Sequence, residues 1–179
     1  IVTDSTAYIP AEYVKKYQLS ITSQVLIWGE EIFRDGVDIQ PDEFYTRLKT
    51  AKTMPTTSQV PIVDMQAAFQ GLVDQDFSVL GIFISSKLSG TQQSAIQAKE
   101  LMGSAGEKVT IIDSHTTTMA LGFQVLAAAR AIEAGASLQE CVGNAQRAHE
   151  RAGVFFAVDT LEFLHRGGRI GGAQRFIGS

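Results

Sequence analysis

Clusters of short hydroxyl side chains follow several apolar runs or precede helical patterns. In an open parallel sheet, the carboxyl ends of the strands share one edge, and ligands bind in the crevice there. Hydroxyl groups and free N–H groups at helix N-termini together suit a compact anion such as a carboxylate or a phosphate. Serine and threonine are also ordinary turn and cap residues, so the prediction of an anion site depends on several clusters converging on one edge. The four clusters are residues 5–6, 56–58, 86–91 and 114–118.

A nucleotide site is not indicated. Residues 85–91 contain one glycine and lack the Gly-Lys-Ser/Thr sequence of a phosphate-binding loop, and the glycine-rich residues 167–172 do not follow a convincing strand. We therefore expect no cofactor.

Two enzymatic alternatives remain open. Asp113, Ser114 and His115 have the residue types of a hydrolase triad, but adjacent residues rarely face each other and no Gly-x-Ser-x-Gly sequence is present. Asp4 and Asp113 end two predicted strands and could hold Mg²⁺ for phosphoryl transfer. We favour a different role for these aspartates, in which they accept hydrogen bonds that fix loops, and we expect no metal site.

The composition restricts the class of protein. Of 179 residues, 45% are hydrophobic and 19% are charged, as in globular domains. The net charge of −4 and the lack of a basic stripe argue against nucleic acid binding. The apolar runs are far shorter than the roughly 20 residues that span a bilayer, so we expect no stable membrane insertion. Cys141, the single cysteine, is expected to lie in a core and fits a reducing cytoplasm.

The elements that would position the hydroxyl clusters alternate between strands and helices. This order predicts an α/β fold with a largely parallel sheet that helices cover on both faces. Gly29-Glu30 is a plausible hairpin turn, and Ser137 with Glu140 forms a capping-box pattern. The helix at residues 117–134 is apolar on nearly all sides and is either a core helix or one wall of a cavity. The predicted strands are residues 1–4, 21–28, 78–85, 109–113 and 153–158, and the predicted helices are residues 10–17, 41–51, 63–74, 91–102, 117–134 and 138–151.

Five ordered segments across the chain resemble the DegV family, also called FakB fatty-acid-binding proteins. These are VTDSTA at residues 2–7, PTTSQ at 55–59, SSKLSGT at 85–91, DS at 113–114 and TLEFLHRGGRI at 160–170. The resemblance implies a carrier with the acyl chain in an apolar tunnel. It also implies a partner, an ATP-dependent fatty acid kinase that phosphorylates the bound acid for phospholipid synthesis.

The resemblance also implies the site. Thr57 and Ser86 are the expected main ligands of the carboxylate, with Thr56, Ser85 and Ser89 as their neighbours. Arg169 is expected to serve the phosphoryl-transfer encounter with the kinase. The sequence departs from the family at Val60, where proline usually follows Thr-Ser-Gln.

The resemblance further implies two domains. Residues 1–158 are expected to form the N-terminal α/β domain, and residues 159–179 to begin the connection to a second domain that closes over the ligand. The chain opens without methionine inside an apolar run and ends without a helix cap, so we expect it to be a fragment that lacks this second domain.

Overall fold

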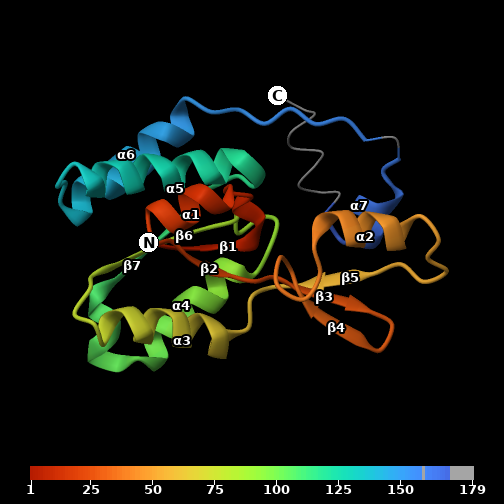
Figure 1. Ribbon diagram of the computed structural model, residues 1–179, viewed down its shortest axis with the longest axis horizontal. Coiled ribbons are helices and arrows are strands. Elements are labelled where there is room, and N and C mark those ends of the chain that lie inside the picture. Colours follow the sequence, from red (N-terminus) through yellow and green to blue (C-terminus); the bar gives the residue numbers. More distant parts are fainter. Residues whose placement is uncertain (159, 170–179) are drawn as a thin grey trace.

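A parallel four-stranded sheet forms the centre of the computed structural model, which describes residues 1–158 and 160–169. The strand order is β2-β1-β6-β7, and every neighbouring pair is parallel (Figure 1). The predicted α/β fold with a largely parallel sheet is therefore confirmed. The strands are β1 (Val2–Asp4), β2 (Ser20–Thr22), β6 (Val79–Phe83) and β7 (Val109–Asp113).

Helices cover both faces of this sheet because its central strand is apolar on both sides. All five residues of β6 are buried, as is typical of a strand inside a parallel sheet. One face packs against α3 (Ile62–Val73) and α4 (Thr91–Leu101). The other face packs against a layer that contains three helices (Figure 1). These are α1 (Ala11–Lys16), α5 (Thr118–Glu133) and α6 (Leu138–Glu150).

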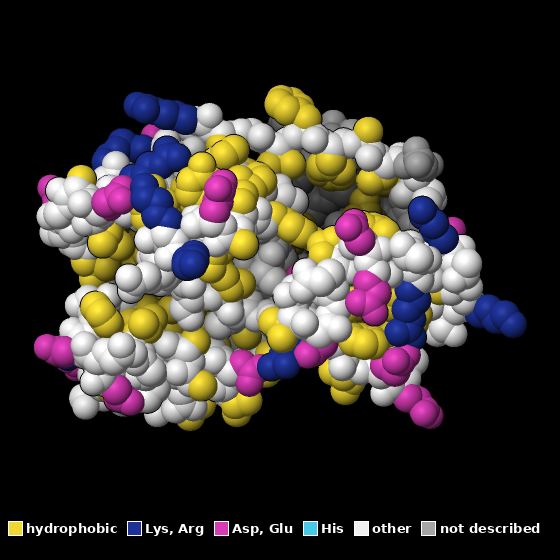
Figure 2. All heavy atoms as spheres, in the orientation of Figure 1, with side chains coloured by type: hydrophobic (Ala, Val, Ile, Leu, Met, Phe, Trp, Pro, Cys, Tyr) yellow, Lys and Arg dark blue, Asp and Glu magenta, His cyan; other side chains and the backbone are white. Residues whose placement is uncertain are grey.

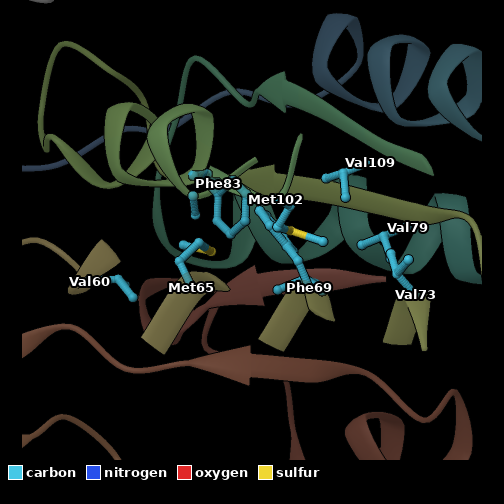
Figure 3. Close-up of a cluster of buried hydrophobic side chains, with 11 residues drawn as sticks. Val60, Met65, Phe69, Val73, Val79, Phe83, Met102 and Val109 are labelled. Atoms are coloured by element: carbon cyan, nitrogen blue, oxygen red, sulfur yellow. The ribbon is translucent and has the colours of Figure 1, made fainter. Parts of the chain in front are cut away.

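The core on the α3 side is built around aromatic rings. Figure 3 shows Met65 and Phe69 of α3 reaching toward Phe83 of β6. The Phe69 and Phe83 ring centroids lie 6.3 Å apart, within the range of favourable aromatic pairs. Gly81 gives the Phe83 ring its space, because a Cβ atom at position 81 would lie 2.6 Å from that ring.

A second, antiparallel sheet lies beside the first, with the strand order β4-β3-β5. The predicted hairpin at Gly29-Glu30 joins β3 to β4 and is confirmed. Trp28 anchors a separate small core, since its ring lies 5.5 Å from Phe44 and its Nε1 donates to the Thr53 carbonyl at 2.8 Å. The elements are β3 (Val25–Trp28), β4 (Glu31–Arg34), β5 (Thr56–Ser58) and the covering helix α2 (Pro41–Leu48).

Two predicted strands are wrong. Residues 21–28 divide into β2 and β3, because the backbone N–H of Gln24 donates to Ser5 Oγ and the chain passes there from one sheet to the other. Residues 153–158 form no strand. Phenylalanine and valine favour strands because they fit a pleated, half-buried surface, whereas Phe155 is fully exposed.

Several helix predictions are confirmed to within about two residues, and the capping box at Ser137 and Glu140 is present. Cys141 is buried, and burial raises the pKa of its thiol. Among the described helices, none has both the length and the apolar character needed to cross a bilayer.

The loop that follows β1 lies directly against the backbone of helix α5. The short 3₁₀ helix η1 (Ser5–Ala7) packs against α5 at Gly122, where a Cβ atom would lie 2.6 Å from the Ala7 carbonyl oxygen. Glycine at position 122 therefore lets α5 press directly on the loop that follows β1.

We expect the Gly122→Ala substitution to destabilise the fold by about 1–2 kcal/mol, because the new methyl group meets backbone that cannot move away cheaply. Gly71→Ala is the matched control: it lies in α3 with open space around it and should stabilise by roughly 0.5–1 kcal/mol. Urea unfolding of both variants measures the difference. Equal effects would show that α5 does not press on this loop.

Candidate functional site

An open cavity of about 410 Å³ lies between the antiparallel sheet, the loop after β6 and the short helix α7 (Glu162–Arg166). Figure 2 shows a hollow in this part of the surface, with hydrophobic side chains along its edges. Strand β3, helix α2 and the segment before it, the loop after β6 and helix α7 all contribute apolar side chains to its wall. These are Val25, Leu26, Ile39, Phe44, Ile84, Leu88 and Leu164. Among the described residues, α5 contributes none to this wall and is mainly a core helix.

Three of the six predicted site residues lie on the cavity wall, namely Thr57, Ser89 and Arg169. Thr57 belongs to β5 of the antiparallel sheet, whereas the sequence predicted only that its cluster precedes the helix near Val63 and meets the other clusters at one edge of the parallel sheet. Thr6, from the loop after β1, lines the same wall. Hydroxyls from three of the four predicted clusters therefore meet at one cavity.

The other three predicted residues do not line the cavity. Thr56 is exposed in β5, beside Thr57. Ser85 is buried, and its Oγ accepts the backbone N–H of Lys87 at 3.3 Å. Ser86 is exposed in the loop after β6, three residues before Ser89.

The backbone N–H groups of residues 84–89 are all engaged within the protein. Two carboxylates take part, because Ile84 donates to Asp4 at 2.8 Å and Ser86 donates to Asp113 at 3.2 Å. The remaining four amides donate to the carbonyl of Thr116 and to the carbonyl and hydroxyl of Ser85. Residues 84–89 therefore offer no free amide, and an anion at this loop would meet hydroxyl groups. The helix N-terminus expected to supply free amides lies beyond this stretch, at Thr91.

The hydroxyl of Thr91 connects the two sheets behind the cavity. Its Oγ1 lies 2.8 Å from Nε2 of Gln24, 3.0 Å from Oγ of Ser89 and 3.4 Å from the backbone nitrogen of Val60. Gln24 precedes β3, Val60 follows β5 and Ser89 lies in the loop after β6. Thr91 and Gln24 are both buried, so this polar cluster sits inside the protein.

Gln59 ties the Thr57 strand to helix α4, which follows the loop after β6. Its Nε2 donates to Ser94 Oγ in α4 at 2.8 Å. A Cβ atom at Gly90 would lie 1.9 Å from the Gln59 side-chain oxygen, so glycine is needed to leave this amide in place. Val60, which replaces the usual proline, uses its backbone N–H in the contact with Thr91, a bond that proline could not make.

Arg169 reaches the cavity from the end of α7. The backbone N–H of Arg169 donates to the Leu164 carbonyl and that of Gly168, at φ +71°, donates to the His165 carbonyl, which together form a Schellman cap. The guanidinium then donates from Nε to the Leu88 carbonyl at 3.3 Å. This contact joins α7 to the loop after β6.

Both strand-end aspartates fix loops, as favoured from the sequence. Asp4 accepts the N–H and hydroxyl of Thr6 at 3.0 and 2.6 Å. Asp113 accepts the N–H of His115 at 2.8 Å, and its carboxylate lies 3.5 Å from Nδ1 of the His115 ring. Ser114 Oγ bonds to the backbone of Thr116 rather than to His115, so these three residues do not form a hydrolase triad. Within the described part of the chain, no three metal-ligating side chains gather.

Sequence reasoning missed the polar residues on the other parts of the wall. Tyr8 and Asp35 both line the cavity. Partial burial, with the nearby charge of Asp35, raises the pKa of the Tyr8 hydroxyl, which therefore stays a neutral hydrogen-bonding group. Gln24 also lines the cavity, and its sequence position could have indicated this, since it is a polar residue inside an apolar run. The sequence around Tyr8 and Asp35 contains no comparable indication.

The chain is similar in sequence to a known protein family and to individual members of it. A family model described as "Uncharacterised protein, DegV family" matches residues 1–179. Protein DegV of Bacillus subtilis (strain 168) is 36% identical over 180 residues, which cover 100% of this chain and 63% of that protein.

Two solved structures are also similar. One concerns fatty acid binding of a DegV family protein from Thermus thermophilus, with a TM-score of 0.86 and 35% identity, over 99% of this chain and 62% of that one. The other is a stearic-acid-binding protein from Eubacterium ventriosum, with a TM-score of 0.84 and 31% identity, over 95% of this chain and 59% of that one. The chain therefore spans less than two thirds of the length of these proteins.

We expect the Thr91→Val substitution to destabilise the protein by about 1–3 kcal/mol, because it keeps the side-chain shape and leaves the buried Gln24 amide without its partner. The double variant Thr91→Val/Gln24→Leu, in which both groups are apolar, should recover much of that loss. Urea unfolding gives both values. A Thr91→Val variant as stable as the unaltered chain would show that this cluster does not hold the sheets together.

Proposed function

The chain belongs to the DegV family, and from this premise we propose that it forms the head-group site of a fatty-acid-binding protein. The observation that carries the proposal is an apolar cavity whose wall also bears Thr57, Ser89 and Arg169. Its volume of about 410 Å³ lies within the range of about 300–1,000 Å³ that is usual for small-molecule sites. Each methylene group removed from water in such a cavity contributes about 0.8 kcal/mol.

In this proposal the carboxylate is bound by hydroxyl groups. Thr57, on the cavity wall, and Ser86, which lies off that wall in the loop that carries Ser89, are the main ligands, and Thr56, Ser85 and Ser89 are their neighbours. Among the described residues, neither the Thr57 hydroxyl nor the Ser86 hydroxyl makes a hydrogen bond, so both remain available to a ligand. The engaged amides of residues 84–89 support the same assignment, since they leave hydroxyls as the donors of this loop.

We further propose that the protein presents its bound acid to a separate ATP-dependent fatty acid kinase for phospholipid synthesis. The lack of a phosphate-binding loop motif in the sequence is compatible with ATP binding by a partner. Such a kinase would place the protein in the cytoplasm. Arg169 would then serve the phosphoryl-transfer encounter, since a guanidinium can donate two parallel hydrogen bonds to phosphate oxygens.

The domain division remains part of the proposal. Residues 1–158 would form the N-terminal domain, and residues 159–179 would begin the connection to a second domain that completes the acyl-chain wall. The greater length of the relatives supports this division. Residues 159 and 170–179 of this connection lie outside the described residues.

We expect Thr57→Ala and Ser86→Ala each to weaken fatty acid binding by about tenfold or more while leaving the fold intact. Hydrogen bonds to a charged acceptor contribute roughly 1.5–3 kcal/mol, and both hydroxyls lie on the surface of the fold. Calorimetry with palmitate or oleate on the full-length protein measures the loss. Ser104→Ala, exposed in η2 (Gly103–Lys108), is the control and should bind as the unaltered protein does.

Two results would contradict this proposal. Wild-type affinity in the Thr57→Ala/Ser86→Ala double variant would exclude these residues as ligands. Turnover of a substrate by the protein alone, without any partner, would favour an enzyme instead. Lipid extracted from the purified full-length protein and analysed by mass spectrometry should contain a long-chain fatty acid.

Arg169→Ala should reduce acyl-phosphate formation by the kinase more than it reduces fatty acid binding, because the guanidinium is proposed to act on the phosphoryl group. Parallel assays of binding and phosphorylation measure the two losses. Arg169→Lys keeps the charge and loses the planar fork, so it should restore only part of the phosphorylation. Equal losses in both assays would make Arg169 a ligand or a structural residue.

A further inference from the structure

The loop that carries Ser86 and Ser89 is held from the neighbouring strand β7 by one carboxylate. We propose that Asp113 is a positioning residue that fixes the aim of the Ser86 hydroxyl at the ligand carboxylate. This inference rests on the proposed function, because it assigns to Asp113 an effect on binding that acts through Ser86.

The geometry at the end of β7 supports this role. Asp113 pairs with Phe83 in the parallel register of β6 and β7, so its side chain stands beside the point where β6 runs into the loop. Its carboxylate lies 3.2 and 3.4 Å from the backbone nitrogen of Ser86 and 2.8 Å from that of His115. Only 11% of the Asp113 side chain is exposed, so water competes little for these bonds.

Asp4, on the opposite side of β6, also binds a backbone N–H of this loop. It ends β1, is fully buried and accepts the N–H of Ile84 at 2.8 Å. Between the two carboxylates, the N–H of Ser85 donates to the Thr116 carbonyl at 2.8 Å. Three consecutive amides of the loop are thus held by neighbours on both sides of β6.

Packing does not replace this support at Ser86. Ile84 and Ser85 are buried and are fixed by their surroundings, whereas Ser86 is exposed. The amides of Leu88 and Ser89 close a turn on the Ser85 carbonyl, and within that turn the Ser86 N–H is held by its bond to the Asp113 carboxylate at 3.2 Å. Binding groups must be held within about 0.5 Å of their working position. Loss of the bond to Asp113 would therefore displace the Ser86 hydroxyl from the ligand even if the fold remained intact.

A double-mutant cycle in the full-length protein tests this role. Asp113→Ala should weaken palmitate binding by about tenfold, similar to Ser86→Ala, because the Ser86 hydroxyl is then no longer aimed. In the Ser86→Ala background, Asp113→Ala should have little further effect, since interactions that act through one residue are not additive. Additive losses would overturn the proposal. Asp76→Ala, a surface residue paired with Lys108, is the control and should leave the affinity unchanged.

Hydrogen exchange of the Ser86 amide tests the same bond without any ligand. The amide should be protected in the unaltered protein, exchange at least tenfold faster in Asp113→Ala and be partly protected in Asp113→Asn, which keeps one acceptor oxygen. Protection that persists in Asp113→Ala would overturn the proposal. If Asp113→Ala does not fold, Asp113→Asn carries both measurements. A protein that binds no fatty acid would refute the proposed function, and the exchange result would still decide whether Asp113 holds Ser86.

Discussion

The hydroxyl of Thr91 contacts groups from three separate parts of the chain, and the cavity lies where those parts meet. Gln24 leads into the antiparallel sheet, Val60 leaves it, and Ser89 belongs to the loop after the central parallel strand. A buried polar cluster of this kind stabilises a unique arrangement only when its members satisfy one another, because an unpaired buried group is costly. The relative position of Thr57 and the Ser86 loop therefore depends on a residue that does not line the cavity.

Much of the fold could be predicted from the sequence because its signals are local. The fully apolar run of β6 indicates a strand buried on both faces, and Ser137 with Glu140 marks the start of α6 through a capping box. The division of residues 21–28 between two sheets was not predictable from hydropathy, since it depends on contacts of Gln24 with Ser5 and Thr91. Similarly, residues 153–158 have a strand-forming composition without a strand in the structure.

The candidate site was predictable in its residue types but not in its bonding. Hydroxyl clusters after strands indicated an anion site, and Thr6, Thr57 and Ser89 do share one cavity wall. Sequence could not reveal that every N–H of residues 84–89 is already engaged, because partners such as Asp4 and Asp113 come from distant strands. Because these amides are engaged, hydroxyl groups are the donors that this stretch of the loop can offer to an anion.

The position of β1 inside the sheet has a consequence for how the chain folds. β1 pairs with β2 on one side and with β6 on the other, and the bond from Asp4 to Ile84 joins residues 80 apart. Contacts between distant residues slow folding, because closing a long loop costs entropy before any contact forms. During synthesis, β1 can pair with β6 only after residues 79–83 have left the ribosome, whereas β2 becomes available earlier. The bond from Ile84 to Asp4 requires that pairing, so the conformation at the start of the Ser86 loop depends on β1 lying beside β6.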